Sequence, residues 1–310
     1  MKQLEYEIEI NPSKSYWSEI FRLVIEEKWF NTPNDYQIWL KGFSKEQFQL
    51  FVAIEKGTGN FIGSVTLTTH ELVNGEKISC VGTFILDPEF RGQGIGLTLF
   101  NEALKHGATN KTLVAVPSMS DKYASKFGFN VIGTKIIDYY AKCSALKPSS
   151  LITDSSLKIK DPDEVGWDKI DAYDRSITGM CFRGDFLREF FSQPGAYNKV
   201  VLNENNDIVG YCNIRTGPDN ILSIGPFYAN SVQAAESVLY GVLKLVPGLA
   251  TLNLIRMATS SENTDAQKLF HTLTNGDYTT SNHYTQFTQK VLQIPFQNVY
   301  SITENDLNFV

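Results

Sequence analysis

The sequence has few cysteines, no long apolar run and no cluster of basic residues, and each absence excludes a class of protein. Cys80, Cys143, Cys181 and Cys212 lie far apart, without C-x-x-C spacing or neighbouring histidines. This pattern indicates neither a disulfide framework nor a zinc site or other metal site. We expect reduced, mostly buried thiols.

No segment is apolar enough for export or for membrane insertion. The first ten residues alternate charged and apolar side chains, unlike the continuous apolar core of a signal peptide. The most apolar long stretch, residues 237–255, is interrupted by Lys244, Pro247 and Gly248, whereas a membrane helix needs an unbroken apolar segment. The sequence therefore predicts a soluble, cytoplasmic protein without a membrane partner.

The formal net charge of −6 argues against a nucleic-acid partner, because nucleic-acid binding draws on clustered Lys and Arg. An acidic surface is compatible with a cationic small-molecule partner, although solubility alone accounts for such a charge. The oligomeric state is not indicated. A length of 310 residues with 42% apolar residues favours two domains, each with its own core.

Hydrophobic periodicity predicts alternating helices and strands in the first half. Apolar residues recur at helical spacing in residues 18–30, and the period changes to two from residue 51. A helix follows the last of three antiparallel strands. The predicted segments are helices at 18–30, 35–40, 94–107 and 121–127, and strands at 51–55, 61–69, 77–86, 113–116 and 128–133.

The second half repeats the same order of elements, which is the most informative feature of its organisation. Predicted strands at 199–203, 208–215, 221–224, 252–257 and 284–288 surround predicted helices at 232–245 and 265–273. Residues 143–156, rich in serine, are typical of a linker. We predict an α+β fold with two tandem copies, residues 1–148 and 149–310, each a mainly antiparallel sheet flanked by helices.

A glycine-rich segment, residues 87–96, joins a predicted strand to a predicted helix. Its sequence is D-P-E-F-R-G-Q-G-I-G, and its glycines let the main chain approach a ligand without obstruction by Cβ atoms. The free N–H groups and the positive dipole end of a helix N-terminus suit a pyrophosphate. Arg91 adds a side-chain donor at the rim.

Spacing separates three kinds of phosphate-binding loop. No Lys-Ser or Lys-Thr follows the last glycine, which excludes a Walker A loop. Leu97 stands where a dinucleotide-binding fingerprint needs its third glycine, and the preceding predicted strands are antiparallel. Residues 91–96, R-G-Q-G-I-G, instead resemble motif A of the GNAT superfamily of N-acetyltransferases, Arg/Gln-x-x-Gly-x-Gly/Ala.

The resemblance covers roughly residues 15 to 140 and implies that the first copy binds acetyl-CoA. Backbone groups of Phe84, Ile85 and Leu86 are expected to contact the pantetheine arm. The pyrophosphate is expected to lie on the segment formed by Arg91, Gly92, Gln93, Gly94, Ile95 and Gly96. A backbone N–H at the end of the preceding strand is expected to stabilise the oxyanion of acyl transfer.

The same resemblance suggests a catalytic tyrosine but does not place it cleanly. GNAT enzymes often carry Tyr-x-x-x-Gly-Phe on a later helix, where the tyrosine protonates the departing thiolate. Counting back from Gly128 and Phe129 puts Ala124, not Tyr123, at that position, and one residue is about 100° on a helix. Tyr123 is the candidate general acid, with a core or solvent position as the alternative.

The general base is unassigned by the sequence. A free alkylamine, with a pKa of about 10.4, is mostly protonated at neutral pH, so some group must take its proton. Asp87 is expected to cap the turn before Pro88. His70 and Glu71 lie at the end of a neighbouring strand. They either act as a base through water or are exposed hairpin residues without a catalytic role, and we expect the latter.

Two further clusters have a structural and a functional interpretation. Trp29, Phe30 and Trp39 either wall an acceptor pocket or fill the core. Asp174 and Arg175 either orient an acceptor or form an ion pair on a helix surface.

The second copy lacks the glycine-rich loop, since its third strand leads into G-P-F-Y-A-N. It is therefore expected to be degenerate. The sequence predicts an acetyl-CoA-dependent N-acetyltransferase acting on a primary amine, expected to be a small molecule. The alternative is a weakly active or inactive acyl-CoA-binding regulatory protein, and a purely structural pair of domains is a third interpretation.

Overall fold

The computed structural model describes residues 4–307, and the two halves share one order of elements, apart from an extra short helix and an extra final strand in the second. The first half consists of β1 (Tyr6–Ile10), α1 (Trp17–Glu26), α2 (Asp35–Gly42), β2 (Phe48–Glu55), β3 (Phe61–Glu71), β4 (Lys77–Leu86), α3 (Ile95–Leu104), β5 (Asn110–Ala115), α4 (Pro117–Phe127) and β6 (Val131–Lys142). Short 3-10 turns join some of these elements. The predicted repeat is confirmed.

The second half begins with a short strand and three helices before its long strands. It consists of β7 (Lys158–Lys160), α5 (Pro162–Val165), α6 (Trp167–Thr178), α7 (Gly184–Ser192), β8 (Ala196–Leu202), β9 (Ile208–Thr216), β10 (Leu222–Ala229), α8 (Val232–Leu243), β11 (Leu254–Ser260), α9 (Thr264–Thr274), β12 (Thr279–Phe287) and β13 (Val299–Ser301).

The strands of both halves form one sheet of 13 strands within residues 4–307, in the order β1-β2-β3-β4-β5-β12-β6-β11-β10-β9-β8-β7, with β13 paired to β10. The pairs β4–β5 and β10–β11 are parallel, and the other pairs are antiparallel. This mixed, mainly antiparallel sheet with helices on its faces is the predicted α+β fold.

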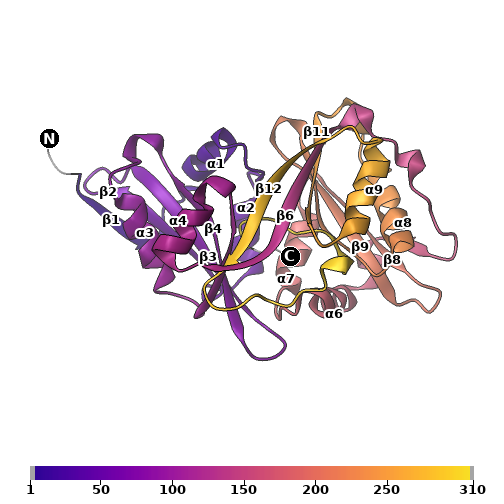
Figure 1. Cartoon of the computed structure of the whole chain (residues 1–310), viewed down its shortest axis with the longest axis horizontal. Helices are drawn as coiled ribbons and strands as arrows, with labels where there is room; N and C mark the ends of the chain where they lie inside the picture. The colour runs from indigo at the N-terminus through magenta and orange to yellow at the C-terminus, as the bar shows by residue number, and fades with distance from the viewer. Residues whose placement is uncertain (1–3, 308–310) are drawn as a thin grey trace.

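The two halves exchange strands at the centre of the sheet. Strand β12 of the second half lies between β5 and β6 of the first, and β6 pairs over Ile136–Lys142 with the whole of β11 (Figure 1). The border at residues 148 and 149 stays a prediction. What the structure adds is that β12 completes the sheet of the first half and β6 that of the second.

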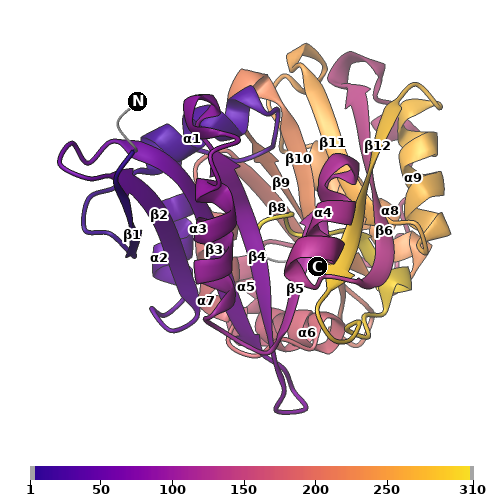
Figure 2. The ribbon, with the colours of Figure 1, turned by 60° about the vertical axis from the view of Figure 1, so that its left-hand side comes forward.

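Three clusters of buried side chains surround the sheet. Helices α3 and α4 cover one face of the first half (Figure 2), and α8 and α9 cover one face of the second. Helices α1, α2, α6 and α7 contribute to a single core shared by both halves, for example where Phe43 stacks on Phe186 with ring centroids 4.8 Å apart. The shared core holds the two copies together.

The segment after β12 crosses back between the copies. Residues 299–307, which we call the tail segment, begin with β13 beside β10 and continue towards β4. Ser301 Oγ donates to the carbonyl of Ile224 at 2.7 Å and accepts from the N–H of Ala258 at 3.1 Å. The tail segment therefore joins β10 to β11 and then enters the first copy.

Several elements were missed by the sequence analysis. Strand β1 alternates Tyr6, Ile8 and Ile10 with glutamates, but its five residues give a weak period-2 signal. Helix α6 buries Ile170 and Tyr173 and ends at Gly179, whose φ of 68° suits glycine. The many polar residues of α6 obscured its helical spacing in the sequence.

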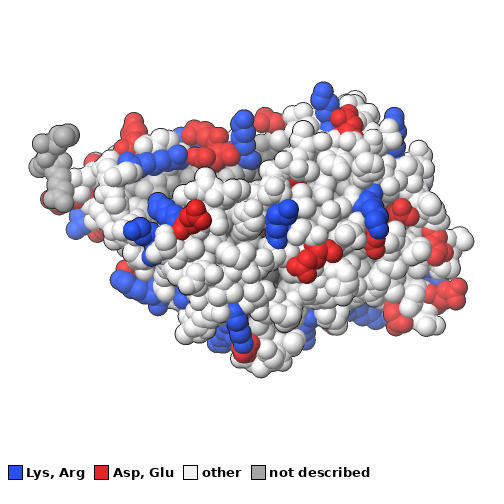
Figure 3. All heavy atoms as spheres, in the orientation of Figure 1, with Lys and Arg blue, Asp and Glu red and all other residues white. Residues whose placement is uncertain are grey.

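None of the four cysteines forms a disulfide within residues 4–307, and Cys80, Cys143 and Cys212 are buried, as expected of mostly buried thiols. No helix in the described part of the chain is both long enough and apolar enough to cross a bilayer. On the face shown in Figure 3, Lys and Arg are interspersed with Asp and Glu, and neither sign gathers into a large patch.

Candidate active site

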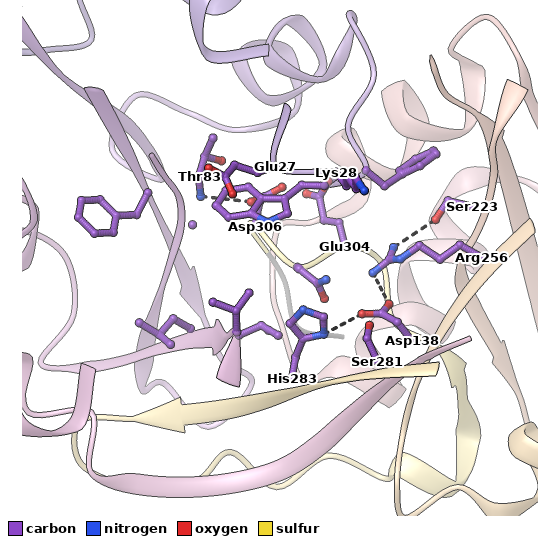
Figure 4. Close-up of a pocket in the computed structure, with 18 of the residues that line it drawn as sticks. Glu27, Lys28, Thr83, Asp138, Ser223, Arg256, Ser281, His283, Glu304 and Asp306 are labelled. Atoms are coloured by element: carbon purple, nitrogen blue, oxygen red, sulfur yellow. Dashed lines mark hydrogen bonds and ion pairs between the residues drawn. The ribbon is translucent and has the colours of Figure 1, made fainter. Parts of the chain in front are cut away.

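A cavity of about 310 Å³ lies where the two halves meet. Its wall combines side chains from β4, β5 and α4 of the first copy with β6, β11, β12 and the tail segment (Figure 4). The lining includes Phe84, Val114, Tyr123, Asp138, Arg256, His283, Glu304 and Asp306. The site therefore depends on both copies.

The cavity reaches the place where β4 and β5 separate. These strands pair only over Ile78–Cys80 on β4. Beyond that point β4 carries a bulge. Gly82 pairs with Thr66 of β3 and Ile85 pairs with Ser64, so the two residues Thr83 and Phe84 lie opposite one residue of β3. Thr83 has a φ of 43°. A bulge of this kind re-aims the main chain and ends regular pairing.

The tail segment contacts this bulge. The N–H of Thr83 donates to Asp306 Oδ1 at 3.1 Å, and Asn31 Nδ2 donates to the other carboxylate oxygen at 3.1 Å. A Cβ atom on Gly82 would lie 2.0 Å from the main-chain oxygen of Asp306, so only glycine permits this approach. One amide expected to be available to an oxyanion is thus occupied by a carboxylate.

The glycine-rich segment forms an open loop between β4 and α3. Asp87 caps the turn as expected, since its side chain accepts from the N–H of Glu89. Gly92 and Gly94 have φ values of 79° and 84°, and a Cβ on either would meet nothing within 4 Å. Helix α3 then starts with no acidic residue in its first turn. These features leave a free, positively polarised helix end.

The remaining loop residues are oriented by contacts around them. Arg91 Nε donates to the carbonyl of Leu86 at 3.0 Å, and its guanidinium forms an ion pair with Glu27 at 2.8 Å. Gln93 Nε2 donates to the carbonyl of Glu89. The cavity wall includes Phe84 of the predicted cofactor residues, but not Ile85, Leu86, Arg91, Gly92, Gln93, Gly94, Ile95 or Gly96.

An acid–base cluster occupies the opposite wall. Asp138 of β6 is fully buried, and its two oxygens lie 2.5 Å from Arg256 of β11 and 2.8 Å from Nδ1 of His283 of β12. Burial alone would raise the pKa of Asp138, but Arg256 and His283 outweigh it and hold that pKa below its usual value. Asp138 is therefore a carboxylate at neutral pH.

The tail segment adds a second buried acid. Glu304 is 4% exposed, and neither carboxyl oxygen has a hydrogen-bond partner among residues 4–307. Burial, reinforced by the negative charges of Asp35 and Asp306, raises its pKa well above the usual value. Glu304 is a neutral acid at the pH where an ordinary glutamate is charged.

Comparison with known proteins matches both halves to one superfamily. Residues 14–129 match the model of the acetyltransferase (GNAT) family, and residues 170–300 match a model described as an acetyltransferase (GNAT) domain. The chain is a tandem GNAT protein. Of the two copies of this GNAT acyltransferase, the first carries the glycine-rich loop of residues 91–96.

Two curated relatives cover about three quarters of this tandem GNAT protein. An uncharacterised protein of Caenorhabditis elegans is 27% identical over 249 residues, which is 77% of each chain. The holothin acyltransferase of a Pseudoalteromonas species is 23% identical over 239 residues, which is 74% of this chain and 72% of the relative.

Solved structures share the whole architecture. A structure described as a putative acetyltransferase from Pyrococcus horikoshii has a TM-score of 0.71 at 14% identity and covers 99% of this chain and 98% of its own. A tandem GNAT protein of the clavulanic acid pathway has a TM-score of 0.63 at 16% identity, covering 92% and 100%. Yeast (Saccharomyces cerevisiae) N-myristoyltransferase with bound myristoyl-CoA scores 0.60 at 12% identity, covering 93% and 79%. At sequence identities this low, the three structures show that the fold is shared and nothing more.

The candidate tyrosine of the first GNAT copy lies beside the cavity. Tyr123 of α4 lines the wall while its ring packs among Phe100, Phe127 and Phe129. Burial raises the pKa of its phenol, which therefore stays protonated. The side chain is 9% exposed, so the position combines core packing with access to the cavity, and its role as acid stays a prediction.

The second GNAT copy carries the same bulge but not the same groups. Gly225 and Pro226 of β10 occupy the positions that Thr83 and Phe84 occupy in the first copy. Proline has no N–H to donate. Strand β13 pairs with β10 just beyond, at Phe227 and Tyr228. This copy lacks the glycine loop, and β13 fills its β10–β11 split. Its degeneracy stays a prediction.

Two expectations about single residues are wrong. His70 is not an exposed hairpin residue, because it is fully buried and its Nε2 contacts the carbonyl of Leu307 at 3.1 Å. Burial lowers its pKa to about 4. Asp174 does not pair with Arg175, but forms a buried ion pair with Arg183 at 3.2 Å. Arg175 pairs on the helix surface with Asp171.

The aromatic candidates divide between two roles. Trp29 and Phe30 line the cavity, whereas Trp39 is fully buried in the shared core. The sequence analysis missed Asp138, Arg256, His283 and Glu304 because they lie far apart in the chain without a spacing motif. The scarcity of histidine, four in the chain, was the one signal that pointed towards His283.

Proposed function

We propose that this protein is an acetyl-CoA-dependent N-acetyltransferase that acetylates a primary amine of a small molecule. The observation that carries the proposal is the open glycine loop of residues 91–96, which leads from β4 into α3 beside the cavity at the β4–β5 split. Membership of the GNAT superfamily supports acyl transfer from coenzyme A.

The residues present fit a coenzyme A molecule. Gly92 and Gly94 expose main-chain N–H groups without Cβ obstruction, which suits a pyrophosphate. The unpaired part of β4 that contains Phe84, Ile85 and Leu86 suits the pantetheine arm. When bound, the coenzyme supplies a thioester whose carbonyl carbon accepts an amine. Of the two bulge amides, that of Thr83 is taken by Asp306, so we assign the oxyanion contact to Phe84.

Cavity size favours a short acyl group and a small acceptor. A volume of about 310 Å³ lies at the lower limit for small-molecule sites. Trp29 and Phe30 offer apolar surface beside the charged groups. The relative described as a holothin acyltransferase is consistent with a small-molecule acceptor. We propose Tyr123 as the group that protonates the departing thiolate.

A second candidate function is binding of acyl-CoA without efficient turnover, as in a regulatory protein. The specific observation in its favour is the hydrogen bond from Thr83 N–H to Asp306. This hydrogen bond occupies the N–H of Thr83, a main-chain donor that would otherwise be available to stabilise the oxyanion of acyl transfer. Under either candidate we place the protein in the cytoplasm, which agrees with its free thiols, and propose no nucleic-acid or membrane partner.

The test combines binding and turnover. Calorimetry and thermal shift should show binding of acetyl-CoA, because a ligand of the native state raises the melting temperature. Release of free thiol should follow when the protein is incubated with phenethylamine, putrescine or glucosamine. Binding without release on any amine favours the regulatory candidate. Absence of binding by the unmodified protein refutes both.

A matched pair of glycine substitutions locates the binding site. Gly94 and Gly57 share a φ of 84°, and a Cβ atom added to either would meet no other atom within 4 Å. Gly94→Ala and Gly57→Ala should each cost about 1 kcal/mol of stability, because alanine is strained at positive φ. Only Gly94→Ala should weaken acetyl-CoA binding, by roughly tenfold. Equal affinity in the two variants contradicts the assignment of the loop.

A further inference from the structure

The opposite wall of the cavity carries a carboxylate–imidazole pair that the proposed cofactor site does not use. Figure 4 shows His283 rising from β12 into the cavity, with Asp138 beside it and Arg256 behind Asp138. Nδ1 of His283 lies 2.8 Å from Asp138, and the imidazole is 16% exposed while the carboxylate is 1% exposed. The pair thus combines a buried carboxylate, which holds the imidazole in place, with an imidazole ring that a ligand in the cavity can reach.

The anchor fixes which ring nitrogen is available. Arg256 contacts Asp138 at 2.5 Å and Ser223 at 3.4 Å, so the carboxylate is itself held in place. A carboxylate at Nδ1 favours the neutral tautomer with hydrogen on Nδ1 and a lone pair on Nε2. Because Nδ1 is engaged by Asp138, Nε2 is the nitrogen left for a ligand in the cavity.

We propose that His283, oriented by Asp138, is the base that takes a proton from the acceptor amine. This inference rests on the proposed function and supplies the base that the sequence does not assign. His283 is the catalytic residue in this assignment. Asp138 and Arg256 are positioning residues, because they act through the imidazole.

The proton balance of the step is complete without a further reactant. Nε2 takes one proton from the ammonium group, and the freed nitrogen lone pair forms the bond to the thioester carbonyl carbon. The carbon–sulfur bond breaks, and its electron pair leaves on sulfur. Tyr123 protonates the thiolate, and the second proton that the nitrogen loses passes through solvent to the phenolate left on Tyr123. The imidazolium then releases its proton to solvent.

Glu304 is the competing base in the cavity. Its carboxyl lacks a partner among the described residues, and burial raises its pKa well above the ordinary range. A carboxyl held neutral in this way has no negative charge to stabilise an ammonium. His283 instead has a fixed carboxylate behind it that stabilises the imidazolium formed in the step.

Strand exchange explains why the base lies in the second half of the chain. His283 and Asp138 project from the same face of the paired strands β12 and β6, since His283 pairs with Ile136 and Ser281 pairs with Asp138. Strand β12 also pairs with β5 of the first copy. The degenerate copy thus contributes to the cavity of the copy that carries the cofactor loop.

Other charged and titratable groups line the cavity around His283. They come from α1 and its end, α4, β6, β9, β11 and the tail segment, and are Glu27, Lys28, Tyr123, Tyr140, Arg215, Arg256, Glu304 and Asp306. Substitution of His283 and of its direct partner therefore has to be compared with a histidine outside the cavity. His271 of α9 is exposed and provides that control.

The first experiment reads the imidazole directly, without turnover. The chain has four histidines, so ring-labelled histidine gives four resonances, and His283→Gln identifies one of them. In the neutral imidazole the nitrogen shifts of that residue should show hydrogen on Nδ1, and Asp138→Asn should move the hydrogen towards Nε2, because the accepting carboxylate is lost. Hydrogen on Nε2 in the unmodified protein, or a tautomer that Asp138→Asn leaves unchanged, overturns the proposal.

The second experiment measures transfer to whichever amine releases thiol in the panel above. His283→Ala should lower kcat/KM by about 10²- to 10⁴-fold, leave acetyl-CoA affinity unchanged, and recover in part when free imidazole is added. His271→Ala should resemble the unmodified protein. Full activity of His283→Ala overturns the inference but not the proposed function, whereas failure of the unmodified protein to bind acetyl-CoA overturns the proposed function. If no amine reacts, the tautomer measurement decides.

Discussion

Glu304 and His283 face the same cavity, and their surroundings give them opposite properties. Glu304 is nearly inaccessible and has no hydrogen-bond partner among residues 4–307. His283 is partly exposed and has a carboxylate at 2.8 Å. Neither property follows from residue type, because burial and neighbouring charge decide the protonation of each group.

Glu304→Gln should stabilise the protein in a pH-dependent manner. The carboxyl of Glu304 has a higher pKa in the folded protein than its usual 4.5. Its favourable contribution is therefore present below about pH 4.5 and is lost as pH rises towards the folded pKa. Glutamine carries no charge at any pH, so the advantage of the variant in melting temperature should grow from acidic to neutral pH.

The control for this prediction is Glu204→Gln, at an exposed hairpin position. It should change the melting temperature little at every pH, because surface substitutions away from special features have small effects. Thermal melts of the three proteins between pH 4 and 8 provide the measurement. A constant difference between Glu304→Gln and the parent protein across that range contradicts the buried, neutral state of Glu304.

At the scale of elements, β13 and the bulges of β4 and β10 distinguish the two copies. Both strands bulge at the same place, but β10 carries Pro226 there and is paired beyond it by β13. Strand β4 carries Phe84, whose N–H is retained. Strand β13 and Pro226 are therefore the features that distinguish the second copy, whose strand split is filled, from the first copy, whose strand split borders the cavity.

Ser301→Ala should loosen the tail segment. The hydroxyl of Ser301 joins the N–H of Ala258 to the carbonyl of Ile224, at 3.1 and 2.7 Å. Removing it leaves two buried main-chain groups without this partner, at a cost of about 1–3 kcal/mol. Urea denaturation measures the loss, and hydrogen exchange should rise most at the N–H of Ala258.

Ser18→Ala is the corresponding control, since Ser18 is exposed on α1. It should change stability by less than about 0.5 kcal/mol. Comparable losses in the two variants would show that β13 contributes little to the connection between β10 and β11.

For the whole molecule, buried contacts join the copies in addition to the exchanged strands. Arg215 of β9 forms an ion pair with Asp35 of α2 at 2.6 Å, and both side chains are at most 2% exposed. The guanidinium also lies 3.8 Å from the ring centroid of Phe190. Together with the shared core of α1, α2, α6 and α7, these contacts favour a single cooperative unfolding transition.

Arg215→Met should destabilise the whole molecule by about 3–5 kcal/mol, because it leaves the carboxylate of Asp35 buried without its charged partner. Glu189→Gln provides the control. It breaks the ion pair of Glu189 with Lys41, which also joins the copies but is 39% and 63% exposed, and should cost less than about 1 kcal/mol. Urea unfolding followed by fluorescence and by circular dichroism tests both values. Similar losses in the two variants, or two separate transitions, would contradict a cooperative unit held by this buried pair.

Local sequence determined the elements, the repeat and the cofactor loop. Strand β4 was predicted at its observed bounds, and the turn at Asp87, the positive φ values of Gly92 and Gly94 and the start of α3 all depend on neighbouring residues. Short-range periodicity and glycine chemistry suffice for such features. They also suffice to identify which copy carries the loop.

Only the tertiary structure decided which groups line the cavity between the copies. Asp138, Arg256 and His283 come from three strands, and β12 reaches the first copy by strand exchange, which no spacing in the sequence encodes. The burial of His70 and Glu304 likewise depends on the tail segment and the packed copies around them. Long-range pairing and burial set these charges and positions, whereas the sequence by itself determined the fold and the glycine loop, because both depend on neighbouring residues.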